Sequence, residues 1–181
     1  PFAVNAHANG ANNPNALFRR AISRDVYEAG RMVAEPVSLF DASPIGDGAA
    51  ALMLVPADKA PEAVRVAGSA SAIDTLGIHD REDPIWLSAA QKSAAKAYGQ
   101  AGVWPEDIDL FELHDAFSIM AALSLEAAGF AERGQGVRLA QEGDILPAGR
   151  IPIATMGGLK ARGHPVGATG ARILVTLINA L

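Results

Sequence analysis

Apolar residues recur at three- and four-residue steps over residues 84–102, which is the spacing of a helix with one buried face. Leu87 begins the series, alanines continue it, and Gly102 follows as a typical helix stop. Two further helices are predicted over the apolar runs 118–129 and 168–180, each of which follows a loop.

Short apolar runs bounded by turn residues alternate with these helices and predict β-strands. They are AAALMLV (49–55), VRVAGSASA (64–72), DIDLFEL (107–113) and IPIAT (151–155). The alternation of strands and helices predicts an α/β fold with a mostly parallel sheet. The stretch PADKAPEA (56–63), with two prolines and mixed charge, is the best candidate for a domain boundary.

The remaining stretches predict loops and one short helix. Ser23 is a plausible N-cap and Gly30 a plausible stop for a helix in SRDVYEAGR. The asparagine-rich segment 9–15 suits turns, and we expect a structural role for it. Residues 131–150 form an expected loop that is rich in glycine and charge, and 156–170 form another long expected loop.

Composition narrows the class of protein. Half of the 181 residues are hydrophobic and 19% are charged, which predicts a folded chain, and no apolar run reaches the roughly 18–20 residues of a membrane span. The net charge of −5 argues against nucleic acid as the main partner. The lack of cysteine excludes disulfides and a thiol nucleophile within these residues, and it favours a cytoplasmic location. The chain begins at Pro1 without an initiator Met, so we expect a fragment or a processed chain.

Two histidines, His114 and His164, each lie between the end of a predicted strand and the start of a helix. Ligands of open α/β sheets usually bind at such loops. Gly163 allows the backbone a positive φ or a close approach, and Pro165 stiffens the next step. His164 is therefore a candidate base or hydrogen-bond donor, and the alternative is a surface histidine that caps a helix.

Two interpretations also stay open for His114. It could donate a hydrogen bond that polarises a carbonyl, or Asp115 or Ser118 could cap the next helix while His114 has no chemical role. No metal site is predicted, because the carboxylates and histidines lack a close ligand spacing such as HExxH. We expect His7 and His79 to be exposed in polar loops without a role.

Two smaller signals complete the candidate chemistry. Ser43 lies in the turn-rich segment 42–48, and no GxSxG motif surrounds it, which argues against a hydrolase nucleophile. Gly167 and Gly170 leave the start of the last helix uncluttered, so that its N–H groups could meet an anion.

Three stretches, ASPIGDGAAALML (42–54), DIDLFELHDAF (107–117) and GGLKARGHPVGATGARILVTL (157–177), together resemble the thiolase superfamily in order and spacing. The chain is most similar to the sterol-carrier-protein and archaeal branch, in which HDAF or HDCF replaces NEAF. The resemblance implies a thiolase-like α/β fold with layered mixed sheets covered by helices, here incomplete. Residues 1–60 would be the tail of the N-terminal half and 61–181 most of the C-terminal half.

The resemblance also implies roles for particular residues. His164 would activate a cysteine that lies before Pro1, and His114 would help to build an oxyanion hole. Ser43 would lie near the pantetheine arm of coenzyme A, Phe117 would wall the pocket, and Gly163 would border the reacting centre. The substrate would be a coenzyme A thioester, with no further cofactor.

Two departures from the family pattern stand out. Ala116 occupies the place of the HDCF cysteine, so no thiol is assigned to proton transfer at the substrate carbon. The family's asparagine before the glycine pair is replaced within Ala154, Thr155 and Met156.

The resemblance leaves three functions open: an acyl-CoA acyltransferase, an aldolase that acts on acyl-CoA side chains, and a non-catalytic acyl-CoA-binding or scaffold subunit. It implies a homo-oligomer, usually a dimer, or a complementing N-terminal thiolase segment. For some members it also implies a small zinc-ribbon/OB-fold partner protein.

Overall fold

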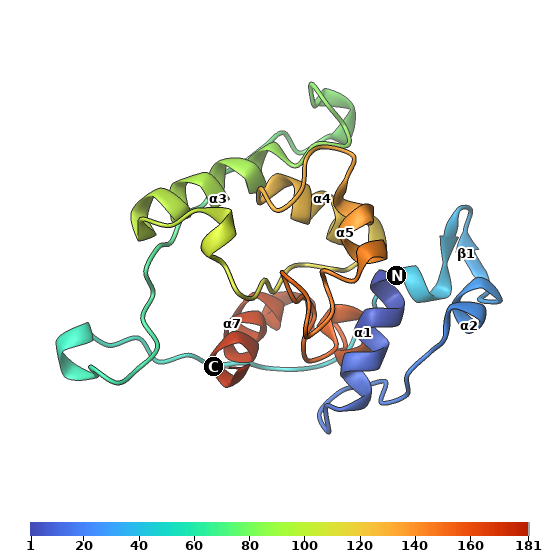
Figure 1. Ribbon diagram of the computed structural model, residues 1–181, viewed down its shortest axis with the longest axis horizontal. Helices are drawn as coiled ribbons and strands as arrows, with labels where there is room; N and C mark the ends of the chain where they lie inside the picture. Colours follow the sequence, from blue (N-terminus) through green and yellow to red (C-terminus); the bar gives the residue numbers. More distant parts are fainter. Residues whose placement is uncertain (181) are drawn as a thin grey trace.

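The computed structural model describes residues 1–180, which form seven α-helices and one small β-hairpin (Figure 1). The helices are α1 (Phe2–Ala11), α2 (Arg24–Glu28), α3 (Ser88–Ala101), α4 (Ser118–Ala127), α5 (Gly136–Glu142), α6 (Gly158–Arg162) and α7 (Thr169–Ala180). The antiparallel strands β1 (Met32–Ala34) and β2 (Val37–Ser38) form the hairpin, in which Met32 faces Ser38 and Ala34 faces Val37.

The hydrophobic core lies between α1, α4 and the segment that follows α5. Leu125 of α4 and Ile145 and Ile151 of that segment are completely buried, and Phe2 of α1 packs into the same cluster. Phe111 stands beside Phe130 at the edge of this cluster, with ring centroids 4.9 Å apart. The core thus joins the chain's first helix to its C-terminal third.

The three long predicted helices are confirmed. Helices α3, α4 and α7 lie within the apolar runs that predicted them, and Gly102 ends α3 in the left-handed conformation with φ of 70°. The short helix after Ser23 is also confirmed, since the Ser23 hydroxyl accepts a hydrogen bond from the Val26 N–H at 3.2 Å.

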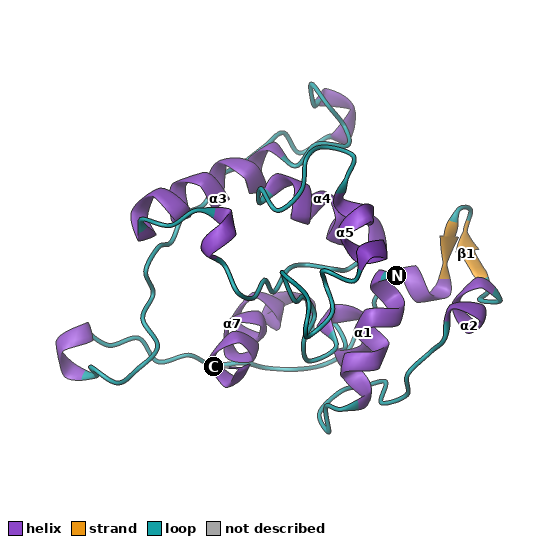
Figure 2. Cartoon of the chain, in the orientation of Figure 1, coloured by secondary structure: helices purple, strands orange, loops and turns teal. Residues whose placement is uncertain are grey.

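The predicted sheet is largely absent among residues 1–180. The runs 49–55 and 64–72 form part of a long loop that crosses the molecule (Figure 2), and the Met53 and Leu54 side chains are more than 80% exposed. Their strand prediction is wrong here because an apolar run becomes a strand only beside a hydrogen-bonding neighbour. The other two runs meet in a single parallel bridge, Phe111 to Ile153.

Two segments predicted as loops contain helices. Helix α5 lies within 131–150 and α6 within 156–170, and they have seven and five residues respectively. Helices this short show no sustained periodicity, so their sequence signal is dominated by the glycines beside them.

The first residues form helix α1 rather than a loop, and its asparagines supply hydrogen bonds that a sheet would otherwise make. The Asn5 side-chain amide donates to the Ile153 carbonyl at 3.1 Å, and the Asn9 amide donates to the Ala154 carbonyl at 3.0 Å. Asn13 beyond the helix continues this row, which we call the asparagine row. The structural role expected for the asparagine-rich segment is confirmed: it forms turns, in which Asn13 Oδ1 accepts the Asn15 N–H at 2.9 Å, and it also makes these distant contacts.

The two remaining histidines behave differently from each other. His79 is exposed, as expected, but His7 is only 6% exposed on α1, so the prediction of an exposed loop is wrong for it. The His7 ring stacks on Phe18 and meets the edge of Phe40, both at 5.8 Å between centroids. Burial lowers the pKa of His7, which favours the neutral ring in this aromatic setting.

No helix within residues 1–180 combines the length and apolarity that crossing a bilayer demands.

The asparagine row makes a direct stability prediction. Asn9→Leu should lower the free energy of unfolding by about 1 kcal/mol, because it removes the buried amide that donates to the Ala154 carbonyl, which keeps only its bond from the Gly157 N–H. Urea unfolding followed by circular dichroism measures this loss. Asn12→Leu is the matched control, since Asn12 is exposed, and it should change stability by less than about 0.5 kcal/mol. Equal losses in the two variants would contradict the role of the row.

Candidate active site

Residues 42–46 hold the two histidine-bearing loops side by side. The Ser43 N–H donates to the Ala116 carbonyl at 2.8 Å, and the His164 N–H donates to the Pro44 carbonyl at 2.9 Å. Single bridges also pair Ala42 with Phe117 and Ile45 with His164. One short segment therefore forms hydrogen bonds with both loops, which are 50 residues apart in sequence.

The two candidate histidines come together at this place. The His114 and His164 ring centroids lie 4.9 Å apart, and the ring planes stand at 80° in an edge-to-face arrangement. His114 is exposed, whereas His164 is only 8% exposed. One imidazole is therefore open to an incoming molecule while the other is fixed by packing.

Thr169 at the start of α7 contacts the His164 ring. The Thr169 hydroxyl lies 2.7 Å from His164 Nδ1 and 3.1 Å from the Pro165 carbonyl oxygen, to which it donates. We infer that the hydroxyl oxygen accepts from Nδ1–H of neutral His164. The Nε2 lone pair of His164 is then free to accept a proton.

The surroundings of His164 favour its neutral form. Burial is the largest cause that lowers its pKa, and the nearby His114 and Arg172 act in the same direction. The imidazole therefore stays unprotonated to a lower pH than an exposed histidine does. Together with the tautomer, this makes His164 Nε2 suited to act as a general base.

The other predicted site residues border the same pair. Gly163 ends α6 with φ of 100°, a backbone conformation that residues with a Cβ rarely adopt. Phe117, at the start of α4, is 46% exposed beside the pair. Ser43 is half-buried in the bridging segment 42–46. All five residues predicted for the site therefore lie in one region, and their individual roles stay predictions.

Each histidine lines a cavity of different character. A cavity of about 460 Å³ adjoins His164, and three of its lining residues are Arg19, Arg162 and Arg172. A cavity of about 420 Å³ adjoins His114 and is lined mainly by apolar side chains such as Phe111. A larger cavity of about 600 Å³ between α3 and α4 includes neither histidine, so we attach no chemistry to it. The histidine pair therefore adjoins one arginine-lined cavity and one mainly apolar cavity.

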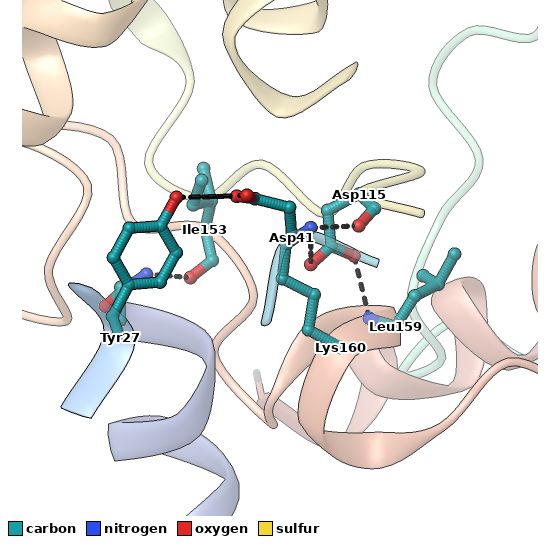
Figure 3. Close-up of polar contacts among 7 residues, drawn as sticks. Tyr27, Asp41, Asp115, Ile153, Leu159 and Lys160 are labelled. Carbon is teal, nitrogen blue, oxygen red and sulfur yellow. Dashed lines mark hydrogen bonds and ion pairs between the residues drawn. The ribbon is translucent and has the colours of Figure 1, made fainter. Parts of the chain in front are cut away.

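Asp115 does not cap α4, which corrects one of the two interpretations made from sequence. Its carboxylate accepts the Leu159 N–H of α6 at 2.7 Å, and the buried Lys160 ammonium donates to the Asp115 carbonyl (Figure 3). The Ser118 hydroxyl is buried without a partner among the described residues, so it does not cap α4 either. The Asp115 carboxylate therefore bonds to the first turn of α6 rather than to the first turn of α4, the helix that follows it in sequence.

Sequence reasoning missed Lys160 and Glu112 at this place. The Glu112 carboxylate accepts from the Thr155 N–H at 2.7 Å and from the Thr155 hydroxyl at 2.8 Å, and burial raises its pKa. Burial lowers the pKa of Lys160, which is 1% exposed. The available signal was their position within two of the motifs that carry the histidines.

Within residues 1–180, no group of three or more histidine, aspartate or glutamate side chains is placed to hold a metal ion.

Comparison with known proteins gives a consistent set of matches. A family model described as "Thiolase C-terminal domain-like" matches residues 70–179. An acetyl-CoA acetyltransferase of Methanothermobacter thermautotrophicus is 46% identical over 168 residues, which are 91% of this chain and 44% of that protein. Benzoylsuccinyl-CoA thiolase subunit BbsB of Thauera aromatica is 32% identical over 186 residues, which are 99% of this chain and 48% of that protein. The chain spans less than half the length of each.

A solved structure described as an Ltp2-ChsH2(DUF35) aldolase has a TM-score of 0.84 with this chain at 23% sequence identity. The match covers 96% of this chain and 47% of that one. At this level of identity the likeness shows a common fold.

Thr169→Val tests the tautomer of His164. Valine has a similar shape but offers no oxygen, so Nδ1–H loses its acceptor and the population protonated at Nε2 should rise. Nitrogen-15 NMR of the histidine rings measures this directly, with the exposed His79 as an internal control. Protonation of Nε2 in the unmodified chain at neutral pH would contradict the assignment.

Proposed function

The chain belongs to the family of thiolase C-terminal-domain-like proteins, and on this premise we propose that it is the histidine-bearing part of a thiolase-like acyl-CoA acyltransferase. Membership confirms the resemblance found in the sequence, and the fold likeness confirms the thiolase-like α/β class. The observation that carries the proposal is the pairing of His114 and His164, whose rings lie 4.9 Å apart.

The pair can divide the work of acyl transfer between its members. His164 Nε2 takes the proton of a thiol, which makes the sulfur nucleophilic toward a thioester carbonyl. His114 donates a hydrogen bond to the oxygen on which negative charge then develops. When the leaving thiolate departs, protonated His164 returns its proton. Since these 181 residues contain no cysteine, a polypeptide segment outside them would supply the thiol.

The two cavities support an acyl-CoA as the substrate. The arginine-lined cavity beside His164 suits the polar and anionic portion of a coenzyme A thioester, and the apolar cavity beside His114 suits its acyl portion. Ser43 would then lie along the pantetheine arm and Phe117 at the wall of the acyl end. In this proposal coenzyme A is the substrate carrier, and no further cofactor takes part.

An aldolase that acts on acyl-CoA side chains is the second candidate. Ala116 leaves the HDAF motif without a thiol, and the solved structure with a TM-score of 0.84 is described as an aldolase. An aldolase would need no acyl-cysteine, so the two functions differ in their dependence on a thiol.

Partner chains form part of the same proposal. One relative is named as a thiolase subunit, and the aldolase structure is named for two components. We therefore infer that this chain works in an assembly, either as a homo-oligomer or beside a complementing thiolase segment. A small zinc-ribbon/OB-fold protein is a further candidate partner.

The central test uses the complete polypeptide that contains this sequence, with acetoacetyl-CoA and coenzyme A as substrates. His164→Ala should lower kcat about 100- to 10,000-fold and abolish the acetyl adduct on a cysteine, because the thiol loses its base. His114→Ala should lower kcat about 100- to 1,000-fold through loss of an oxyanion donor. Steady-state kinetics and intact-mass spectrometry provide the two measurements.

His79→Ala is the matched control, since its side chain is exposed and it should leave kcat unchanged. Carbon–carbon cleavage that persists after every cysteine is replaced would favour the aldolase instead. Binding of acyl-CoA without any turnover would favour the third function, a non-catalytic acyl-CoA-binding subunit.

The pH dependence offers an independent check on the base. Because its surroundings lower the pKa of His164, the fall of kcat/KM on the acid side should lie at a lower pH than for an enzyme whose base is an unperturbed histidine. His114→Asn removes one of the causes that lower the pKa of His164 and should therefore move this acid limb to higher pH. An acid limb that stays in place in His114→Asn would show that the titrating group is not His164.

A further inference from the structure

We propose that the buried pair Lys160–Asp115 is a positioning element that fixes the separation of the His114 and His164 rings. The inference rests on the proposed function only in treating these rings as the reacting groups. The placement of the pair is independent of any substrate.

The pair connects the loop that carries His114 to the helix that precedes His164. Asp115 directly follows His114 in the chain, and its Oδ1 accepts the Leu159 N–H at 2.7 Å. Lys160 Nζ lies 3.8 Å from Asp115 Oδ2 and also donates to the Asp115 carbonyl. Figure 3 shows both connections, which run from one loop to consecutive residues of α6.

Helix α6 transmits this attachment to His164. The Gly163 N–H donates to the Leu159 carbonyl at 3.1 Å, and His164 is the next residue. Asp115 therefore binds the same residue, Leu159, whose carbonyl holds the backbone just before His164. A shift of the Asp115 loop relative to α6 would change the distance between the rings.

Glycine at position 158 is what allows the carboxylate to come so close. A Cβ at Gly158 would lie 2.5 Å from Asp115 Oδ2 and 2.8 Å from Oδ1, closer than side-chain carbons approach such atoms. Gly158 also has φ of 54°, in the left-handed region. The lack of a side chain at Gly158 therefore leaves room for the Asp115 carboxylate.

A contribution to stability does not by itself explain why a charged pair is buried here. Side-chain exposure is 1% for Lys160 and 4% for Asp115, so both charges are removed from water. Apolar residues of similar volume often stabilise a protein as well as a buried ion pair does. What the polar pair adds is two hydrogen bonds to defined atoms: the Asp115 carboxylate accepts the Leu159 N–H, and the ammonium donates to the Asp115 carbonyl.

Other charged and titratable groups surround the pair without replacing either member. Burial lowers the pKa of Lys160, and Asp115 and then Asp41 act in the opposite direction. The Tyr27 hydroxyl donates to Asp41 at 2.9 Å (Figure 3). Lys160 also contributes to the lowered pKa of His7 on α1, after burial as the largest cause. Lys160 therefore interacts electrostatically with groups from several elements, of which, within residues 1–180, Asp115 alone bonds to it.

The test compares the ring contact with the stability of the fold. Lys160→Met combined with Asp115→Leu replaces the pair by apolar residues, so the chain should remain folded while the edge-to-face contact is lost. NMR detects the contact as a cross-peak between the ring protons of His114 and His164 and as their ring-current shifts. Asp115→Asn keeps an acceptor for the Leu159 N–H and should retain both signals.

Two further variants make the result decisive. Lys160→Met alone removes the bond to the Asp115 carbonyl and should weaken the cross-peak, even if the double variant fails to fold. Lys96→Met is the matched control, because Lys96 is an exposed lysine of α3. A merely structural pair would lower the melting temperature in Lys160→Met while leaving the ring signals unchanged, and that result overturns the proposal.

The complete enzyme supplies a second readout. There Lys160→Met should lower kcat by up to about 100-fold with little change in KM, because misplaced reacting groups slow chemistry more than binding. An equal loss in Lys96→Met would count against the pair. If the unmodified enzyme shows no acyl transfer but the ring signals respond as expected, the proposed function fails and the positioning role stands.

Discussion

The structure depends on satisfying buried backbone groups without an extended sheet. Among residues 1–180 the only ladder is a small hairpin, so side chains supply the partners that strands would otherwise provide. The asparagine row donates to carbonyls at 153–156, and Glu112 accepts the Thr155 N–H. Asp115 does the same for Leu159. Each of these bonds joins segments far apart in sequence, and together they set the shape of the C-terminal third.

The same bonds place the histidine pair. The segment around 153–156 is held by α1 on one side and by Glu112 on the other, and it leads directly into α6 and Gly163. Several hydrogen bonds therefore fix the backbone that leads to His164. His114 belongs to the loop that supplies Glu112 and Asp115, so one short stretch both carries a candidate donor and anchors the opposite loop.

The sequence predicted what depends on local pattern. Helices α3, α4 and α7 were predictable because their apolar residues recur at helical spacing or form continuous runs. The end of α3 was predictable because Gly102 readily adopts the left-handed conformation that ends a helix. The histidine pair was predictable from motif position. The burial of α1 could not be predicted, because asparagine and histidine are usually found at the surface. Here the asparagines bond to distant backbone carbonyls, and His7 packs against aromatic rings. The role of Lys160 was equally hidden, since a lysine is exposed unless a specific partner pulls it inward.

The loop across the middle of the molecule has a practical consequence. Its apolar run 49–55 has the composition of a buried strand, yet Met53 and Leu54 are open to solvent and outside any ladder in the described part of the chain. Unpaired apolar backbone of this kind readily adds to a similar segment of another molecule. A preparation of these residues by themselves should therefore be kept dilute, and co-expression with a polypeptide that covers the loop should improve its yield and colloidal behaviour.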